Sequence, residues 1–402
     1  MGTFLSEAFE RLLAQTSLDF KRYLYPQVSM GRLTGIFGPR GVGKTTLMLQ
    51  YLKEHRVATA QHAFYFSADS LYFQQTTLLA FIHDLYRLEG YRLFFIDEIH
   101  RYSNWVQELK NIYDAFPDVQ VVYSCSSMLE LTTGGHDLSR RTKVCHLSGM
   151  SFREYLNFTR QKALQPIALA ELLKDPRAFN SLGLMDTLLS AFKQYLARGY
   201  YPFAFEDAHS HYERVLRIID KIIFEDIPSA FELKTQNLPL FKKILSYLAS
   251  IPPGEVNTNS IARNMGVAHQ TIFHYLTILE KVGLIQMIYP IEGGNQYLRK
   301  PQKILLHNTT LFFALRELVG SEFQKGTLRE LYCVQALRDA EESVYYSAEG
   351  DYCTRAAHFE VGGKNKTAQQ LAHLKTPAFV VKDDIIVATA RDIPLWLMGF
   401  LY

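Results

Sequence analysis

Short apolar runs alternate with segments of helical periodicity over the first 150 residues. The runs that have the length of buried strands lie at residues 33–37, 63–67, 92–98 and 119–123. Between them, apolar side chains recur three and four positions apart, which predicts helices, and the same spacing predicts one or two helices over residues 4–25. Strands that alternate with helices and are apolar throughout are typical of a parallel sheet covered on both faces. The pattern therefore predicts an α/β domain over residues 1–150.

The periodicity changes after residue 150. Residues 151–235 carry apolar side chains three and four positions apart, which predicts a helical connector or lid. Residues 236–310 predict three short helices, with a turn at Gly266 and Val267 between the second and the third, and then two strands. We interpret this segment as a winged helix.

The last segment, residues 311–402, predicts a small α/β domain. Its predicted elements are a helix over residues 328–338, a hairpin over 344–352 and strands at 379–381 and 385–388. The fold class is therefore α/β throughout.

Composition narrows the cellular setting. The 402 residues suffice for two or three domains, and 48% hydrophobic content is ordinary for a globular protein. The formal charge of +3 is nearly balanced, so a nucleic-acid or membrane partner has to be argued from local sequence. The four cysteines lack C-x-x-C spacing, which argues against a zinc site and a disulfide framework. No apolar run approaches the roughly 18 residues that span a bilayer, and no signal peptide is evident. We expect a soluble, cytoplasmic protein with no membrane partner.

A glycine-rich loop joins the first predicted strand to a predicted helix. It fits G-x-x-x-x-G-K-[ST] and consists of Gly38, Pro39, Arg40, Gly41, Val42, Gly43, Lys44 and Thr45, with Thr46 next in the helix. Glycines let the backbone curl so that its N–H groups and the helix N-terminus surround a polyphosphate. We expect Lys44 to reach the β- and γ-phosphates and the Thr45 hydroxyl to coordinate Mg²⁺. The loop predicts a site for ATP and Mg²⁺; a turn that binds nothing is the alternative.

An acid pair, Asp97 and Glu98, ends the third predicted strand. In P-loop ATPases an acid at this place holds the Mg²⁺ shell, and the next carboxylate orients and polarises the attacking water. We expect Asp97 to take the first role and Glu98 the second. The alternative is two solvated acids that cap the following helix.

Hydroxyl side chains end the fourth predicted strand. Ser124 and Ser126 are candidates to hydrogen-bond the γ-phosphate or the attacking water, although small polar residues at a strand end also form turns.

The sequence around these motifs resembles the bacterial and archaeal AAA+ ATPases that carry a C-terminal nuclease-like domain of uncharacterised function. The resemblance rests on residues 37–47, 95–100, 104–105, 126–127, 137–141 and 147–156. It implies an AAA+ parallel sheet with helices on both faces, followed by the helical connector, the winged helix and a small restriction-endonuclease-like domain. It also implies phosphate and Mg²⁺ binding by Gly38, Gly43, Lys44 and Thr45, hydrolysis by Asp97 and Glu98, and a polar sensor at Ser124 or Ser126.

The same resemblance implies an arginine finger at Arg140 or Arg141. A guanidinium placed at a neighbouring subunit's γ-phosphate neutralises developing charge, and this contact is worth orders of magnitude in rate. A finger that acts in trans requires a homo-oligomer, as a ring or a dimer. Two adjacent arginines in a solvated loop are the alternative.

Two parts of the C-terminal half are candidates to bind DNA: the winged helix and the nuclease-like segment that follows it. The third helix of the winged helix has only Lys281 as a basic residue, with Arg299, Lys300 and Lys303 around the predicted wing. A winged helix used for protein contacts is equally compatible with this sequence, so a protein partner remains an alternative.

The C-terminal segment resembles a restriction-endonuclease fold. This resemblance implies a Mg²⁺ site at Glu330, Asp351 and Glu360, with a lysine two residues after Glu360 to polarise water. Position 362 is glycine, and Lys364 lies four residues after Glu360, so it reaches the metal only through a bulge at Gly362 and Gly363. This departure puts cleavage in doubt, and the alternatives are an active nuclease and a degenerate domain retained to bind nucleic acid or a partner.

Together these features predict a Mg²⁺-dependent AAA+ ATPase that couples its nucleotide state to the winged-helix and nuclease-like module. The alternatives are an ATP-switched DNA-binding or defence-type module with slow hydrolysis, and a DNA endonuclease gated by ATP.

Overall fold

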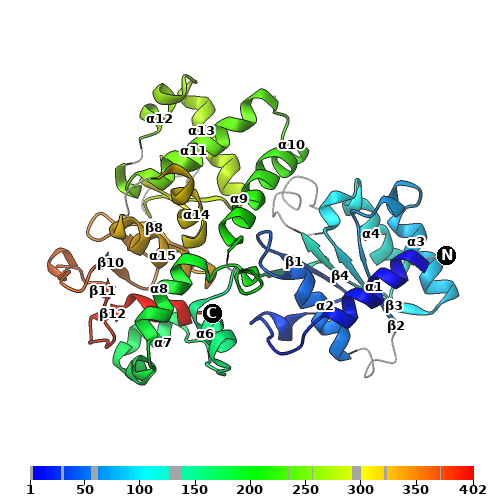
Figure 1. Cartoon of the computed structure of the whole chain (residues 1–402), viewed down its shortest axis with the longest axis horizontal. Coiled ribbons are helices and arrows are strands. Elements are labelled where there is room, and N and C mark those ends of the chain that lie inside the picture. The colour runs from blue at the N-terminus through cyan, green and yellow to red at the C-terminus, as the bar shows by residue number, and fades with distance from the viewer. Residues whose placement is uncertain are drawn as a thin grey trace. The chain divides into compact units, whose positions relative to one another are not determined.

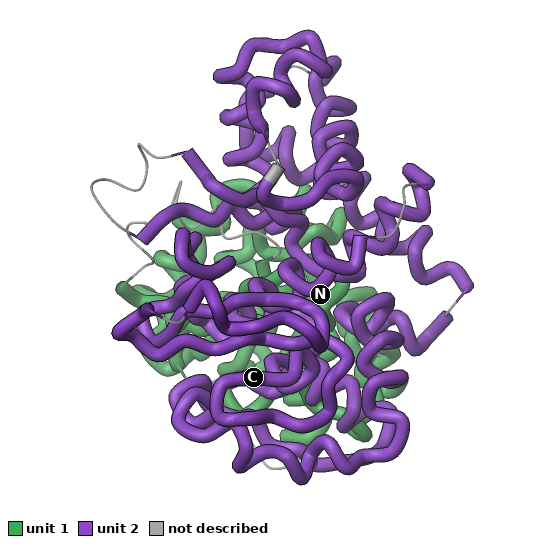
Figure 2. The backbone as a smooth tube through the Cα atoms, turned by 90° about the vertical axis from the view of Figure 1, so that its left-hand side faces the viewer, with its two compact units in different colours: residues 1–148 green, residues 149–402 purple. Residues whose placement is uncertain are grey.

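The structure is a computed structural model. It describes residues 3–28, 31–55, 62–125, 138, 140–207, 209–233, 235–255, 257–291, 300–320, 324–371 and 373–402. The chain divides into two compact units, Met1–Ser148 and Gly149–Tyr402, which we call unit 1 and unit 2 (Figure 2).

Unit 1 contains a parallel sheet of five strands in the order β2-β3-β4-β1-β5. The strands are β1 (Leu33–Phe37), β2 (His62–Ser67), β3 (Tyr91–Asp97), β4 (Gln120–Cys125) and β5 (Lys143–His146). The register pairs Ser67 with Asp97 and Ile36 with Ser124, so the polar strand ends gather at one edge. The four predicted strands are confirmed, whereas β5 was not predicted because Val144 and His146 are exposed and give it no apolar run.

Helices cover both faces of this sheet, with α1 and α2 on one side and α3 and α4 on the other (Figure 1). Their bounds are α1 (Thr3–Gln15), α2 (Lys44–His55), α3 (Leu78–Leu88) and α4 (Trp105–Ala115), with short 3-10 turns at Tyr25–Gln27, Leu71–Gln74 and Ile99–Arg101. The prediction of helix up to residue 25 is wrong. After α1 the chain runs irregularly, because side chains of α2 bind its carbonyls: Gln50 donates to Ser17 and Phe20, and Lys53 to Thr16.

Unit 2 begins with helices, as predicted for residues 151–235. They are α6 (Phe152–Arg160), α7 (Leu169–Lys174), α8 (Leu188–Arg198), α9 (His211–Lys221) and α10 (Ile227–Ala230). Two 3-10 segments lie at Pro176–Leu184 and Pro202–Phe205, and a π-helix at Ile222–Asp226 joins α9 to α10. Among the described residues, no helix of either unit combines the length and the apolar content that a membrane crossing requires.

The predicted order of three helices and two strands follows. The elements are α11 (Leu238–Ser250), α12 (Thr258–Met265), α13 (His269–Lys281), β6 (Ile285–Ile288) and β7 (Lys303–Leu306), and β6 pairs antiparallel with β7. Every residue of both strands is buried. The chain after β6 is bound to the C-terminal sheet, since the Tyr346 N–H donates to the Tyr289 carbonyl at 2.8 Å. The hairpin is therefore an internal part of unit 2.

The C-terminal part of unit 2 is a mixed sheet beside two helices. The helices are α14 (Thr309–Val319) and α15 (Lys325–Asp339), and the strands are β8 (Tyr345–Tyr346), β9 (Tyr352–Cys353), β10 (His358–Gly362), β11 (Ala378–Lys382) and β12 (Asp392–Pro394). The sheet order is β12-β11-β10-β9-β8, antiparallel from β8 to β10 and parallel from β10 to β12. A strand at 385–388 was predicted wrongly: these residues lie in the irregular connection to β12, where Ile386 and Val387 are exposed. The predicted α/β class is confirmed.

Candidate functional site

The glycine-rich loop connects β1 to α2, as the sequence predicts. Gly41 and Gly43 have φ angles of 82° and 96°, in the region where a side chain is strained. Gly38 is required for a different reason, because a Cβ atom there would lie 2.1 Å from the Leu147 carbonyl oxygen. Val42 is fully buried and anchors the tip of the loop.

Lys44 is the first residue of α2, and its side chain is buried under the loop. Its ammonium group donates to the carbonyls of Gly38 at 2.8 Å and Pro39 at 2.9 Å. Burial lowers the pKa of Lys44, while the carboxylates of Glu98 and Asp97 act in the opposite direction. Thr46, in contrast, is exposed on the first turn of α2.

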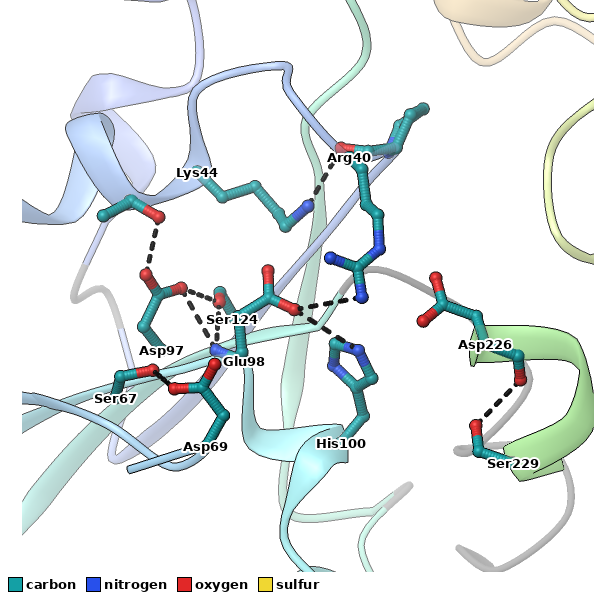
Figure 3. Close-up of polar contacts among 12 residues, drawn as sticks. Arg40, Lys44, Ser67, Asp69, Asp97, Glu98, His100, Ser124, Asp226 and Ser229 are labelled. Carbon is teal, nitrogen blue, oxygen red and sulfur yellow. Dashed lines mark hydrogen bonds and ion pairs between the residues drawn. The ribbon is translucent and has the colours of Figure 1, made fainter. Parts of the chain in front are cut away.

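Asp97 lies at the end of β3 and is the centre of a hydrogen-bond network. Its Oδ2 accepts from the Thr45 hydroxyl at 2.5 Å and from the Tyr65 hydroxyl at 2.9 Å. Its Oδ1 accepts from the Ser124 hydroxyl and, at 3.1 Å, from the Glu98 N–H (Figure 3). All four donors are neutral, and the side chain is 4% exposed. The loop, β2, β3 and β4 thus converge on one carboxylate.

Glu98 does not continue the strand, although the sequence predicted that it would. Its φ of 50° and ψ of 41° are left-handed, which is uncommon for a residue with a side chain. The conformation is held by its N–H, which also donates to the Ser124 hydroxyl at 2.9 Å. The Glu98 carboxylate faces Arg40 of the loop at 3.8 Å and His100 at 3.3 Å (Figure 3). The strand end therefore aims the second acid at the glycine-rich loop.

A buried arginine fixes the loop from behind. Arg22 donates to the Val42 carbonyl at 2.6 Å and to the Ser148 carbonyl at 2.8 Å. Next to it, the Tyr23 hydroxyl donates to the His146 carbonyl at 2.7 Å and accepts from the Ser148 N–H at 3.2 Å. The segment before β1 thereby links the loop to the end of β5.

The remaining predicted residues of unit 1 differ in their surroundings. Arg140 is exposed, whereas Arg141 is half-buried, with Nε 3.4 Å from the Asp114 carboxylate and its guanidinium 5.8 Å from the Tyr113 ring centre. Ser124 is buried in β4 and bound to Asp97. Ser126 lies outside the described residues.

Sequence reasoning missed three residues of this site: Arg22, Tyr65 and His100. Tyr65 left a usable signal, because it is the one hydroxyl in the apolar run Phe64-Tyr65-Phe66, and a buried tyrosine hydroxyl needs a partner. Arg22 stood in a segment that was interpreted as helical, and His100 follows the acid pair without a spacing that indicates a role.

The predicted acids of unit 2 lie together, but around a lysine. Glu330 comes from α15, Asp351 from the turn before β9, and Lys303 from β7. The Lys303 ammonium donates to Glu330 Oε2 at 2.7 Å and to Asp351 Oδ1 at 3.0 Å. The Tyr352 hydroxyl donates to the same Glu330 oxygen at 2.7 Å. Asp351 Oδ2 accepts from the Val361 N–H at 2.9 Å.

Glu360 is buried in β10 and has its own cation. That cation is Lys366, which forms an ion pair with Glu360, and not the predicted Lys364, which is exposed. After Gly362 the chain turns back, with the Lys366 N–H donating to the Gly363 carbonyl at 2.9 Å. Burial raises the pKa of Glu360, and Lys366 opposes this shift. No group of three or more acids, histidines and cysteines in the described parts of the chain is arranged to hold a metal ion.

The sheet of unit 1, the loop at the start of α2 and the acid pair after β3 define a P-loop ATPase fold. Residues 31–156 match the family model described as an AAA domain, so this part of the chain is similar to that family and has the AAA+ P-loop fold. Residues 189–322 match a model described as a domain of unknown function, DUF8612.

Comparison with individual proteins gives low sequence identities. The uncharacterized protein MJ1637 of Methanocaldococcus jannaschii is 29% identical over 282 residues, which are 67% of this chain and 59% of that protein, so the match spans about three-fifths of the relative's length. AMPPCP-bound DnaA from Aquifex aeolicus is 15% identical, with 69% of this chain and 87% of that chain covered and a TM-score of 0.29. Cdc6p from Pyrobaculum aerophilum is 13% identical, with 80% and 95% covered and a TM-score of 0.26. At these TM-scores the two solved structures carry no argument about partners.

Proposed function

We propose that unit 1 binds ATP with Mg²⁺ and hydrolyses it, and that the nucleotide state acts on unit 2. The hydrogen bond between Thr45 and Asp97 is the main support, because it joins the loop hydroxyl and the strand carboxylate at 2.5 Å. Both are oxygen ligands of the type that Mg²⁺ prefers. Bound there, Mg²⁺ would offset charge on the phosphates.

The side chains of the site have separate roles in this proposal. Lys44 and the loop N–H groups bind phosphate oxygens, and the fixed α2 N-terminus adds its dipole. Glu98 orients the attacking water and takes up its proton, for which its left-handed backbone aims it at the loop. Arg40 and His100 hold the Glu98 carboxylate in this direction. Ser124 fixes Asp97 and the Glu98 N–H together.

Two variants test this assignment. Glu98→Gln keeps the shape of the side chain but removes the base, so we expect kcat to fall by about 10²- to 10⁴-fold with ATP affinity nearly unchanged. Lys44→Ala should abolish measurable binding of a fluorescent ATP analogue. Exposed Glu89→Gln is the matched control, with wild-type turnover and affinity. Turnover of Glu98→Gln at the wild-type rate would contradict the proposal.

We further propose that Arg140 is the arginine finger and that the active form is a homo-oligomer. The exposure of Arg140 supports this choice, since Arg141 already faces Asp114 of its own unit. Arg140→Ala should slow turnover with ATP affinity retained, and Arg141→Ala should do so much less. Specific activity should rise with protein concentration in the wild type. A double variant that turns over ATP normally would exclude both arginines.

DNA binding by unit 2 is the second candidate function. It is favoured by α13, which exposes Gln270, His274 and Lys281, with Lys300 exposed before β7. Steady-state ATPase activity with and without duplex DNA, single-stranded DNA and RNA tests it, at two salt concentrations. Phosphate contacts predict an affinity that falls as salt rises. An affinity that does not change with salt, or an ATPase rate that no nucleic acid changes, would favour a protein partner for this surface.

A further inference from the structure

The acidic cluster of unit 2, formed by Glu330, Asp351 and Glu360, is built around an internal cation. Lys303 Nζ lies 2.7 Å from Glu330 and 3.0 Å from Asp351, so it sits between the two carboxylates. Its side chain is 10% exposed, and its ammonium lies 4.5 Å from the centre of the Tyr352 ring. A surface lysine that bends over a neighbour by chance has neither this burial nor three partners.

Each of the three acids already has at least one carboxylate oxygen bonded to a donor. Glu330 Oε2 accepts from Lys303 and Tyr352, and the two Asp351 oxygens accept from Lys303 and the Val361 N–H. Glu360 faces Lys366, and the Gln370 amide nitrogen, in its hydrogen-bonding orientation, lies 3.1 Å from both Glu360 oxygens. A divalent ion needs several of these oxygens at about 2.0–2.6 Å and cannot share their centre with an ammonium group.

The strand that carries Lys303 cannot withdraw it easily. Lys303 starts β7, which pairs with β6, and β6 is tied to the C-terminal part by Arg338, whose guanidinium donates to the Met287 carbonyl at 2.9 Å. The residues present therefore do not fit a Mg²⁺ ion, and the nuclease site implied by the sequence resemblance is not assembled.

We infer that Lys303 takes the place of a divalent cation in this cluster, and that the charge cluster joins β7 to α15 and β9 instead of cleaving nucleic acid. Without Lys303, two carboxylates that lie within 3.0 Å of one ammonium would face each other with no cation between them. The same two carboxylates would then be a place for a divalent ion. Removal of this one charge should convert a structural cluster into a metal site.

Mn²⁺ binding to the full chain tests the inference, measured by isothermal titration in the absence of nucleotide. Wild type and Glu330→Gln should bind the same number of Mn²⁺ ions, because the cluster holds none. Lys303→Met should bind one more than wild type, and Lys303→Met combined with Glu330→Gln should not. Exposed Lys364→Met is the matched control and should behave as wild type.

Thermal unfolding gives a second readout that does not depend on stoichiometry. Mn²⁺ should raise the Tm of Lys303→Met by a few degrees, since an ion that binds only the folded state stabilises it. In the wild type, Mn²⁺ should change the Tm no more than it does in Glu330→Gln. One more Mn²⁺ in wild type than in Glu330→Gln would overturn the inference, and this comparison remains decisive if Lys303→Met does not fold. A folded Lys303→Met that binds no additional ion would overturn it as well.

Discussion

His211 should make unit 2 sensitive to mild acid. The side chain is fully buried at the start of α9, with its ring 5.3 Å from that of Phe203. Neither ring nitrogen has a hydrogen-bond partner among the described residues. Burial lowers the pKa of His211 to about 4, and the nearby cations Arg198 and Arg214 act in the same direction. The folded chain therefore holds this histidine neutral.

The size and sign of the effect follow from linkage. The unfolded chain takes up the proton near pH 6.5 and the folded chain near pH 4, so the unfolded state binds more protons between these values. The contribution of neutral His211 to the free energy of unfolding is therefore fully present above pH 6.5 and is lost as the pH falls through this window. With a pKa of about 4 in the folded state, the loss is about 2 kcal/mol at pH 5 and about 3 kcal/mol at pH 4. Burial lowers the pKa of His307 to about 4 as well and adds a second loss.

Tryptophan fluorescence can measure this loss in unit 2 alone. The chain has two tryptophans, Trp105 in unit 1 and buried Trp396 in unit 2, so a Trp105→Phe background reports unit 2. In this background, urea unfolding of the parent and of His211→Leu is compared at pH 7.5 and pH 5. We expect His211→Leu to lose about 2 kcal/mol less than the parent over this interval. Leucine has no ring nitrogen to protonate and is close to histidine in volume.

Exposed His209→Leu is the control and should follow the parent at both pH values. The comparison between parent and variant cancels the contribution of His307 and of the carboxylates. Equal losses in the parent and in His211→Leu would refute the reasoning, because they would show that His211 is not held neutral by the fold.

Three further predictions concern unit 1. Arg22→Met removes two charge-assisted hydrogen bonds to the Val42 and Ser148 carbonyls, so it should lower the free energy of unfolding of unit 1 by about 3–5 kcal/mol. Chemical unfolding followed by Trp105 fluorescence measures this, and exposed Arg11→Met should be as stable as the wild type. Equal stability of the two variants would contradict the prediction. Gly38→Ala forces its Cβ against Leu147 and should abolish ATP-analogue binding, whereas Gly31→Ala, whose Cβ meets nothing closer than 3.4 Å, should bind normally. Tyr65→Phe removes one donor from Asp97 and should lower Mg²⁺-dependent turnover about 10-fold with the fold intact. Tyr123 bonds Thr142 instead, so Tyr123→Phe should leave turnover unchanged. A Mg²⁺ titration of the ATPase rate distinguishes the two variants.

Much of unit 1 could be predicted because its strands and its loop obey local rules. Continuous apolar runs mark β1 to β4, and a glycine-rich pattern of fixed spacing marks the loop. The predictions that failed concern segments whose structure depends on contacts between residues far apart in the sequence. The segment after α1 has helical spacing, yet Gln50 and Lys53 bind its carbonyls and hold it irregular. The strand β5 is set by pairing with β1 and not by its own exposed sequence.

The same division holds for the candidate sites. Lys44, Thr45, Asp97 and Glu98 could be predicted as site residues because P-loop chemistry fixes the spacing of such residues in sequence. The partners that orient them, Arg22 and Tyr65, come from other segments and have no fixed spacing. In unit 2 the acids were found, but Lys303 was interpreted as a cation near the wing, because the pairing that buries β7 beside α15 cannot be deduced from local sequence.

The two carboxylate networks of this chain differ in the charge of their donors. Asp97 receives three hydroxyls and one N–H, all neutral, so its negative charge remains for a cation beside Thr45. Glu330 and Asp351 share an ammonium group, which neutralises one of their two negative charges and occupies the place between them. Both networks are well bonded and largely buried, so the number of hydrogen bonds does not separate them. The charge of the donor does, and it supports the proposal that a divalent cation binds in unit 1 and not in the acidic cluster of unit 2.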